Sequence, residues 1–313
     1  MKSTHGMKSS SLKQLILSPK YWPTWFFLGV LRLVIILPLR WLEIIGSFFG
    51  LLLYYLKPSR VRIATINLKI AYPEKSDDEI QALCKESIKQ LGIGALEIGL
   101  AWWQLKRLVK SSKINGLEHL TSALKKGNGV ILLTSHFTCL EVGGHILSTK
   151  LPLEAVFKPA KNKAFDYIMF KKRQEHLSLV ISNDNPRKMI AALKRNHALW
   201  YAPDQNLHGK DIVFAPYFNE LATAITAPAR LAKLSGAALV PYYIKRHKHE
   251  DTGKIIYEIF IQPEVENFPT DDINHDAAKI NSINESLVRN NPGQYLWVHK
   301  RYKTRPAGEK AVY

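Results

Sequence analysis

The sequence predicts an α/β protein with a central, mostly parallel sheet flanked by helices and an apolar helical membrane anchor at the N-terminus. Two observations support this fold class. Short apolar runs typical of buried strands alternate with longer amphipathic segments from Lys113 to the C-terminus. Strands separated by helices of this length pair in parallel through right-handed crossovers. Ahead of this alternation, residues 22–56 are strongly apolar and aromatic.

Each element follows from its local pattern. The apolar run Val130 to Leu133 predicts a buried strand, and Ser76 with Glu79 three residues later predicts a helix start by the capping-box rule. The predicted strands are 113–116, 129–133, 153–158, 179–182, 198–202, 237–243 and 254–262, with 295–298 as a candidate last strand. The predicted helices are 76–91, 95–109, 118–126, 140–147, 162–176, 186–195, 223–234 and 271–290.

The N-terminal region divides into a basic segment, 1–20, and an apolar segment, 21–58, ahead of the α/β domain, 59–313. The apolar segment is too long for a signal peptide, and no small-residue cleavage site follows it. Arg32, Pro38, Arg40 and Glu43 interrupt it, so no uncharged piece reaches the ~20 residues of a spanning helix. We expect a helix pair lying at the membrane surface. A single span and a buried helix pair are the alternatives.

Charge and cysteine content narrow the class of protein. The formal net charge is +18 over 313 residues, which favours contact with nucleic acid, an anionic membrane surface or acidic partners. Aromatic residues are concentrated in the apolar N-terminal segment, which favours a membrane over nucleic acid. The only cysteines, Cys84 and Cys139, provide no disulfide framework, so we expect a reducing compartment. Cys139 is interpreted as a small packed side chain rather than a nucleophile.

The main candidate for chemistry is His136, at the end of the strand 129–133. Glu141 follows five residues later, in the first turn of the predicted helix 140–147. On one continuous helix the two side chains would point roughly 140° apart, but with His136 in the turn they can meet. The carboxylate would then hold the imidazole in the tautomer that accepts a proton, which makes His136 a candidate general base. The alternative is a chance spacing.

Three further groups carry charge or hydrogen-bonding capacity. Lys171, Lys172 and Arg173 lie late in the helix 162–176 and either bind an anion or form a solvated face. Asp204 and Gln205 follow the strand 198–202 and either belong to a site or cap a turn. The closing segment 294–303 is either a basic edge that meets anionic groups or a solvated strand.

Together these residues resemble one family. An apolar N-terminal anchor, His136-x4-Glu141, a helical Arg173, Asp204-Gln205 and Trp297-Val-His-Lys-Arg301 occur in the order seen in the lipid A biosynthesis late acyltransferases of Gram-negative bacteria, a branch of the glycerolipid-type acyltransferase superfamily. Two features depart from the family pattern. Tyr217-Phe-Asn219-Glu replaces a Phe-Phe-Gly turn, and Pro228 falls inside the predicted helix 223–234.

The resemblance implies transfer of a fatty acyl group from acyl carrier protein to a hydroxyl of a Kdo-lipid A precursor. It implies His136 as base paired with Glu141, and phosphate or sugar binding by Arg173, Lys171, Lys172, Asp204 and Gln205. It implies no cofactor, no metal and no nucleic-acid partner, and a catalytic domain on the cytoplasmic side of the inner membrane, in contact with its lipid. Alternatives are acylation of another glycolipid or glycerophospholipid, hydrolysis, and non-catalytic membrane binding.

Overall fold

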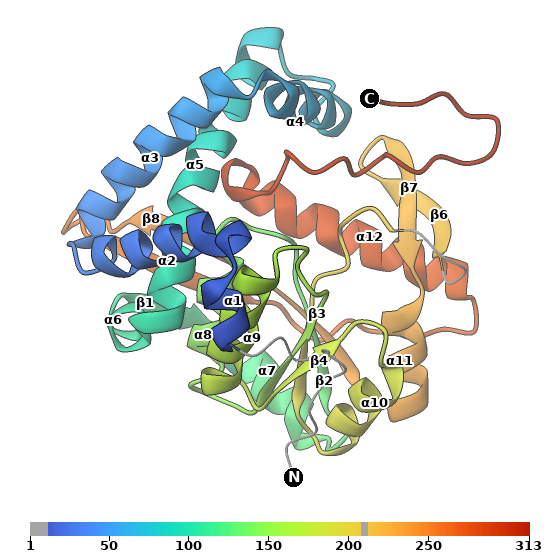
Figure 1. The fold of residues 1–313 in the computed structure, drawn as a ribbon. Helices are drawn as coiled ribbons and strands as arrows, with labels where there is room; N and C mark the ends of the chain where they lie inside the picture. The colour runs from blue at the N-terminus through green and yellow to red at the C-terminus, as the bar shows by residue number, and fades with distance from the viewer. Residues whose placement is uncertain (1–11, 208–211) are drawn as a thin grey trace.

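A seven-stranded sheet with the order β1-β9-β8-β2-β5-β3-β4 forms the centre of the protein in the computed structural model, which describes residues 12–207 and 212–313 (Figure 1). All neighbouring strands are parallel except β8 and β9, which confirms the predicted fold class. The strands are β1 (Ser112–Asn115), β2 (Val130–Leu133), β3 (Leu153–Phe157), β4 (Leu179–Ser182), β5 (Ala198–Tyr201), β8 (Ala238–Lys248) and β9 (Ile255–Ile261).

Helices cover both faces of this sheet (Figure 1). They are α5 (Asp77–Trp103), α6 (Leu105–Lys110), α7 (Leu117–Lys125), α8 (Leu140–Leu147), α9 (Lys163–His176), α10 (Pro186–Lys194), α11 (Ala227–Ser235) and α12 (Ile273–Asn290). The capping box of Ser76 and Glu79 is confirmed at the start of α5. The predicted break between 91 and 95 is wrong, because α5 continues through it. Within α5, the lack of a side chain at Gly92 lets the backbone of α3 approach closely, and the lack of one at Gly94 does the same for the turn before α8.

The region 212–235 also differs from the prediction. An antiparallel hairpin of β6 (Ile212–Tyr217) and β7 (Glu220–Ile225) occupies the first part of the predicted helix 223–234. Phe218, in the turn that departs from the family pattern, has a φ of 54°. Pro228 lies in the first turn of α11, where no backbone N–H is needed, so it starts the helix rather than breaking it.

The closing segment forms no strand among the described residues. It contributes one isolated antiparallel bridge, between Tyr295 and Phe137, and a short 3-10 helix, η2 (Pro292–Gln294). Its backbone hydrogen bonds go instead to the turn that follows β2, since the N–H of Thr138 donates to the carbonyl of Gln294 at 2.7 Å. The segment therefore holds the turn that carries His136.

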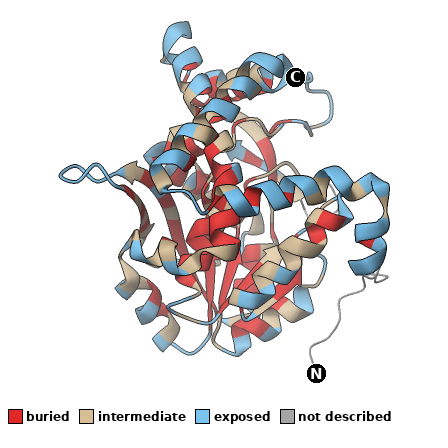
Figure 2. Ribbon diagram, turned by 60° about the vertical axis from the view of Figure 1, so that its left-hand side comes forward, coloured by how far each residue is buried: buried red, intermediate tan, exposed pale blue. Residues whose placement is uncertain are grey.

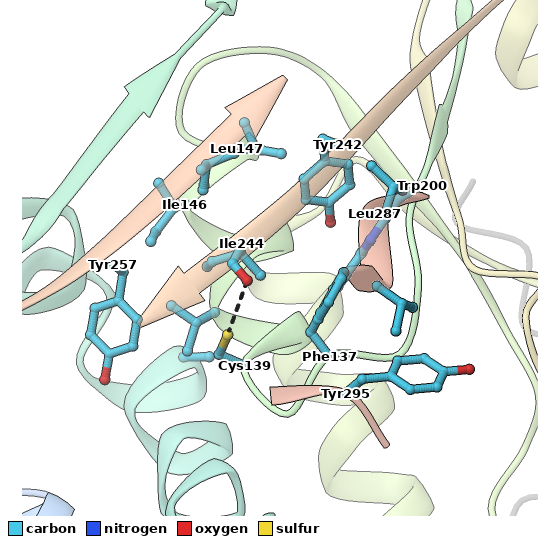
Figure 3. Packing of buried hydrophobic residues seen from close by; sticks show 14 of the residues in the cluster. Phe137, Cys139, Ile146, Leu147, Trp200, Tyr242, Ile244, Tyr257, Leu287 and Tyr295 are labelled. Carbon is cyan, nitrogen blue, oxygen red and sulfur yellow. Dashed lines mark hydrogen bonds between the residues drawn. The ribbon is translucent and has the colours of Figure 1, made fainter. Parts of the chain in front are cut away.

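The core between the sheet and α8 is filled by large side chains. Figure 3 shows Ile146 and Leu147 of α8 facing Tyr242 and Ile244 of β8. Cys139 lies beside them and donates a hydrogen bond to the carbonyl of Ile244 at 3.8 Å. Burial raises the pKa of the Cys139 thiol well above its ordinary value, so the residue packs as predicted and does not ionise at neutral pH.

The N-terminal helices pack on the outside of this body. They are α1 (Leu12–Leu17), η1 (Pro19–Tyr21), α2 (Trp22–Val34), α3 (Leu39–Leu56) and α4 (Pro58–Ala71). The buried face of α3 includes Gly46 and Gly50, which lie directly against α5 near Gly92. Small residues on both helices let the two backbones approach closely.

The other faces of α1, α2 and α3 remain apolar and exposed. Nearly all large apolar side chains that are exposed in the described residues lie between 12 and 56; Phe214 and Leu234 are the others. Figure 2 shows these N-terminal helices largely exposed around a buried sheet. Within the described part of the chain, α3 is the one helix long and apolar enough to span a membrane, and only 17% of it is buried. These features are consistent with an anchor.

The contact between α3 and α5 gives a direct test. A Cβ added at Gly92 would overlap Gly46 O and lie 2.6 Å from Gly50 Cα, both backbone atoms that cannot yield without moving α3. We expect Gly92→Ala to lower the free energy of unfolding by about 1–3 kcal/mol. Urea unfolding in detergent, monitored by circular dichroism, measures the change.

Gly29→Ala is the matched control. Gly29 lies in α2 and a Cβ there would have no atom within 4 Å. This change should leave stability unaltered or raise it by about 0.5–1 kcal/mol through helix propensity. Equal destabilisation by both substitutions would contradict a close contact between α3 and α5.

Candidate functional site

Two neighbouring parallel strands bring His136 and Asp204 together. In the pairing of β2 with β5, Leu133 is opposite Tyr201, and each candidate residue lies three positions beyond its strand partner. The N–H of Thr134 extends the pairing by donating to the carbonyl of Tyr201 at 3.0 Å. Because the carboxyl ends of parallel strands meet at one edge of the sheet, both side chains emerge at the same place.

Both carboxylate oxygens of Asp204 contact His136. His136 Nδ1 lies 2.6 Å from Oδ1, and the backbone N–H of His136 donates to Oδ2 at 2.9 Å. The Asp204 side chain is fully buried, whereas that of His136 is 29% exposed. The tautomer that donates its Nδ1–H to this carboxylate has Nε2 as its proton acceptor.

Asp204 remains ionised despite its burial. Burial alone would raise its pKa, but the His136 charge, the two hydrogen bonds from His136 and one from the Tyr295 hydroxyl lower the pKa below its ordinary value. Tyr295 also accepts a hydrogen bond from the Tyr217 hydroxyl at 3.1 Å. A buried, fully partnered carboxylate of this kind fixes the orientation of the imidazole.

The closing segment lines the other flank of the histidine. The N–H of Leu296 donates to the His136 carbonyl at 3.1 Å. His299 Nε2 accepts the backbone N–H of Asn206 at 2.9 Å. Burial and the nearby charge of His136 lower the pKa of His299 to about 4, so His299 is neutral at pH 7. Arg301 is buried and Lys300 is exposed, so the closing segment is not the solvated strand that was one of its two interpretations.

The predicted contact between His136 and Glu141 is not formed. No hydrogen bond or ion pair in the described residues joins them. Glu141 instead forms a bidentate ion pair with Arg173 of α9. Arg173 Nε donates to Oε1 at 3.0 Å and Nη2 donates to Oε2 at 2.6 Å. The indole N–H of Trp102 adds a third bond to Oε1 at 2.9 Å.

The physical reason is the burial of Arg173. A guanidinium 14% exposed needs a compensating carboxylate, and Glu141, in the first turn of α8, faces α9 and α5 rather than the turn. Asp204, which was expected to bind a phosphate or sugar, instead provides the carboxylate that contacts His136. The sequence did offer a signal for Asp204, because it lies three residues after β5, as His136 lies three residues after β2. Using that signal required knowing that β5 lies next to β2.

A cavity of about 310 Å³ opens beside His136. Its wall is mostly apolar, and its polar side chains include Arg173 and Gln205, both predicted site residues. The Arg173 guanidinium also lies over the Trp200 ring, 5.6 Å from its centroid. The principal apolar side chains of the wall are Leu140, Val156, Phe157, Met169, Trp200 and Ile225.

Lys171 and Lys172 are not part of this wall. Lys172 binds Glu175 in the next turn of α9, with Nζ 2.6 Å from Oε2, and lies over the Trp103 ring. Lys171 is exposed on the same helix. The structure therefore separates these two lysines from His136, Arg173 and Gln205, which line one cavity. Asp204 joins this group through its contact with His136.

The Glu141–Arg173 pair makes the free energy of unfolding depend on pH in the acidic range. Burial alone would raise the pKa of Glu141, but the Arg173 charge and hydrogen bonds lower it from 4.5 to about 2. The pair therefore contributes fully above pH 4.5, and its contribution is lost as the pH falls toward 2. We expect Glu141→Gln to lower the free energy of unfolding at neutral pH by about 3–5 kcal/mol. The gap between the two proteins should narrow between pH 4.5 and 2, as measured by denaturant unfolding.

Glu74→Gln is the control, because Glu74 is an exposed carboxylate with no ion pair among the described residues. It should leave stability nearly unchanged over the same pH range. A pH-independent gap between wild type and Glu141→Gln would show that the pair does not lower the pKa of Glu141.

Comparison with known proteins identifies the family of this chain. The sequence model of a family described as "Bacterial lipid A biosynthesis acyltransferase" matches residues 10–304. The chain is 36% identical to the lipid A biosynthesis palmitoleoyltransferase of Escherichia coli (strain K12), covering 95% of this chain and 96% of the relative. It is 32% identical to the lauroyltransferase of that strain, covering 95% and 97%, and 25% identical to its myristoyltransferase, covering 94% and 91%. The chain belongs to the bacterial lipid A biosynthesis acyltransferase family.

Proposed function

We propose that this enzyme transfers a fatty acyl group from the thioester of acyl carrier protein to a hydroxyl of a Kdo-lipid A precursor. Membership of the acyltransferase family supplies the reaction class. The observation that carries the chemistry is the His136–Asp204 pair at the wall of the apolar cavity. An imidazole held by a buried carboxylate beside an apolar cavity is suited to activating a hydroxyl.

In the proposed step, His136 Nε2 takes the proton from the acceptor hydroxyl as its oxygen attacks the thioester carbon. The C–S bond then breaks, and the imidazolium returns the proton to the departing thiolate. Asp204 accepts the Nδ1–H throughout and stabilises the positive charge that develops on His136. The reaction balances without a covalent acyl-enzyme, so no serine or cysteine nucleophile is required.

Glu141 is assigned a positioning role rather than direct contact with the base. It holds Arg173 at the wall of the cavity, and Arg173 in turn lies over Trp200. Gln205 provides a polar group on the same wall. The apolar remainder of the wall suits the acyl chain. In this scheme the two members of the His-x4-Glu motif serve one site through different partners.

The proposed location is the cytoplasmic face of the inner membrane. In this proposal the exposed apolar side chains on α1, α2 and α3 enter the lipid, and the cavity lies close to the membrane that holds both acyl chains. The net charge of +18 would attract two acidic partners, the carrier protein and the lipid A precursor.

Mass spectrometry of a lipid A precursor incubated with acyl carrier protein thioester tests the proposal. Wild type should add the mass of one or more acyl groups. We expect Asp204→Asn to lower kcat by about 10²–10⁴-fold, because the amide no longer holds the base tautomer. His136→Ala should abolish transfer. Glu141→Gln should also lower transfer, through displacement of Arg173.

Asp276→Asn is a matched control for the loss of a buried carboxylate. Asp276 accepts hydrogen bonds from Thr270 in a different part of the fold, so this variant should keep wild-type kcat even where its stability falls. Reactions with water, another glycolipid or a glycerophospholipid as acceptor separate the alternatives. Full activity of Asp204→Asn, or release of free fatty acid with no change in the glycolipid, would refute the assignment.

A further inference from the structure

Two adjoining hollows lie between the start of α4 and the closing segment. Their volumes are about 610 and 910 Å³, and both are lined by Ser59 and Arg60. We call the combined hollow the α4 groove. Its lining residues differ entirely from those of the apolar cavity beside His136.

The charges that line the α4 groove are all positive. They come from Lys57, Arg60, Arg62 and Lys300, and no aspartate or glutamate lines either hollow. None of these four cations has an ion-pair partner among the described residues. Arg60 donates to the carbonyl of Val298, which also lines the groove, at 3.3 Å. A groove lined by cations without carboxylates favours an anionic ligand.

This groove adjoins the proposed catalytic base. Leu296 and His299 line it, and the N–H of Leu296 donates to the carbonyl of His136. Arg60 lies close enough to His299 to help lower its pKa, although burial and the His136 charge have larger effects. The α4 groove therefore adjoins the turn that carries His136, on a set of residues that the acyl cavity does not use.

The apolar end of α3 leads into the same groove. Leu53 of α3 lines it, and Leu52, Tyr55 and Leu56 beside it are exposed. A molecule that contacts this region meets apolar side chains and then, from Lys57 onward, unpaired cations. An apolar surface followed by a basic one matches an amphiphile with acyl chains and an anionic head group. This order favours a lipid over an acidic protein.

We infer that the α4 groove binds the anionic head group of the acceptor glycolipid through its phosphate or carboxylate groups. The inference rests on the proposed acyl transfer. It also moves anion recognition away from the cluster predicted from sequence, because Arg173 is already paired with Glu141 and Lys172 with Glu175. Bound there, the head group would present an acceptor hydroxyl to His136.

The double variant Arg62→Gln, Lys300→Gln tests the inference in steady-state kinetics. Both residues are exposed, and apart from the position of Lys300 Nζ over the Tyr313 ring, 5.4 Å from its centroid, the change removes charge alone. We expect KM for a phosphorylated lipid A precursor to rise about tenfold or more while kcat changes less than about twofold. The rise should shrink at high ionic strength and should be smaller with the same glycolipid after phosphatase treatment.

Lys125→Gln, Lys194→Gln is the matched control. These exposed lysines lie in α7 and α10, which precede the amino ends of β2 and β5, at the opposite edge of the sheet from His136. The control removes the same charge and should leave KM for the phosphorylated glycolipid unchanged. An equal rise in both double variants would reduce the effect to net charge and overturn the inference.

Three other outcomes also overturn it. A raised KM for the acyl carrier protein thioester, with KM for the glycolipid unchanged, would assign the groove to the carrier. Weaker co-sedimentation with phosphatidylglycerol vesicles, with both KM values unchanged in detergent, would assign it to bulk lipid. Unchanged kinetics and vesicle binding would leave it without a ligand. Because wild type is active in every one of these outcomes, they are distinct from failure of acyl transfer itself.

Discussion

The parallel pairing of β2 with β5 is the constraint on which the site depends. It brings the ends of both strands to one edge of the sheet. His136 Nδ1 and Asp204 Oδ1 therefore lie 2.6 Å apart, although the two residues are 68 positions apart in sequence. The carboxylate then binds both the ring and the backbone of His136. A single buried aspartate thereby fixes the turn, the tautomer and the direction of the imidazole.

A second constraint acts on the other side of the turn. Arg173, carried in by α9, is nearly buried and draws Glu141 of α8 and the indole of Trp102 of α5 into one network. Three helices are joined there by charge-assisted hydrogen bonds. Because buried charges must be compensated, Glu141 serves the arginine, and the histidine takes its carboxylate from a different strand.

The N-terminal helices have two kinds of face, one packed against the rest of the protein and one apolar and exposed. Gly46 and Gly50 of α3 pack against α5, while the remaining faces of the helices keep large apolar side chains exposed. Such a surface is stable beside lipid but costly in water. The end of α3 at Lys57 then marks a change from apolar to basic surface, close to the segment that carries His299.

Local sequence was sufficient for much of the fold. The apolar run before His136, the capping box at Ser76 and the alternation of strands with helices predicted the elements and the parallel sheet, because these signals lie within a few residues of one another. Errors arose where tertiary packing overrides local preference. α5 continues through Gly92 because another helix packs there, and the hairpin β6–β7 replaced part of a predicted helix.

The sequence by itself determined which residues have the chemistry for a site: His136, Glu141, Arg173, Asp204 and Gln205 were all identifiable. Only the tertiary structure decided their partners. Spacing along the chain favoured Glu141 for His136, since five residues suggest proximity, whereas strand order placed Asp204 there instead. Strand order depends on how the whole sheet packs, and no local pattern encodes it, so the pairing of charges across the site became visible only in three dimensions.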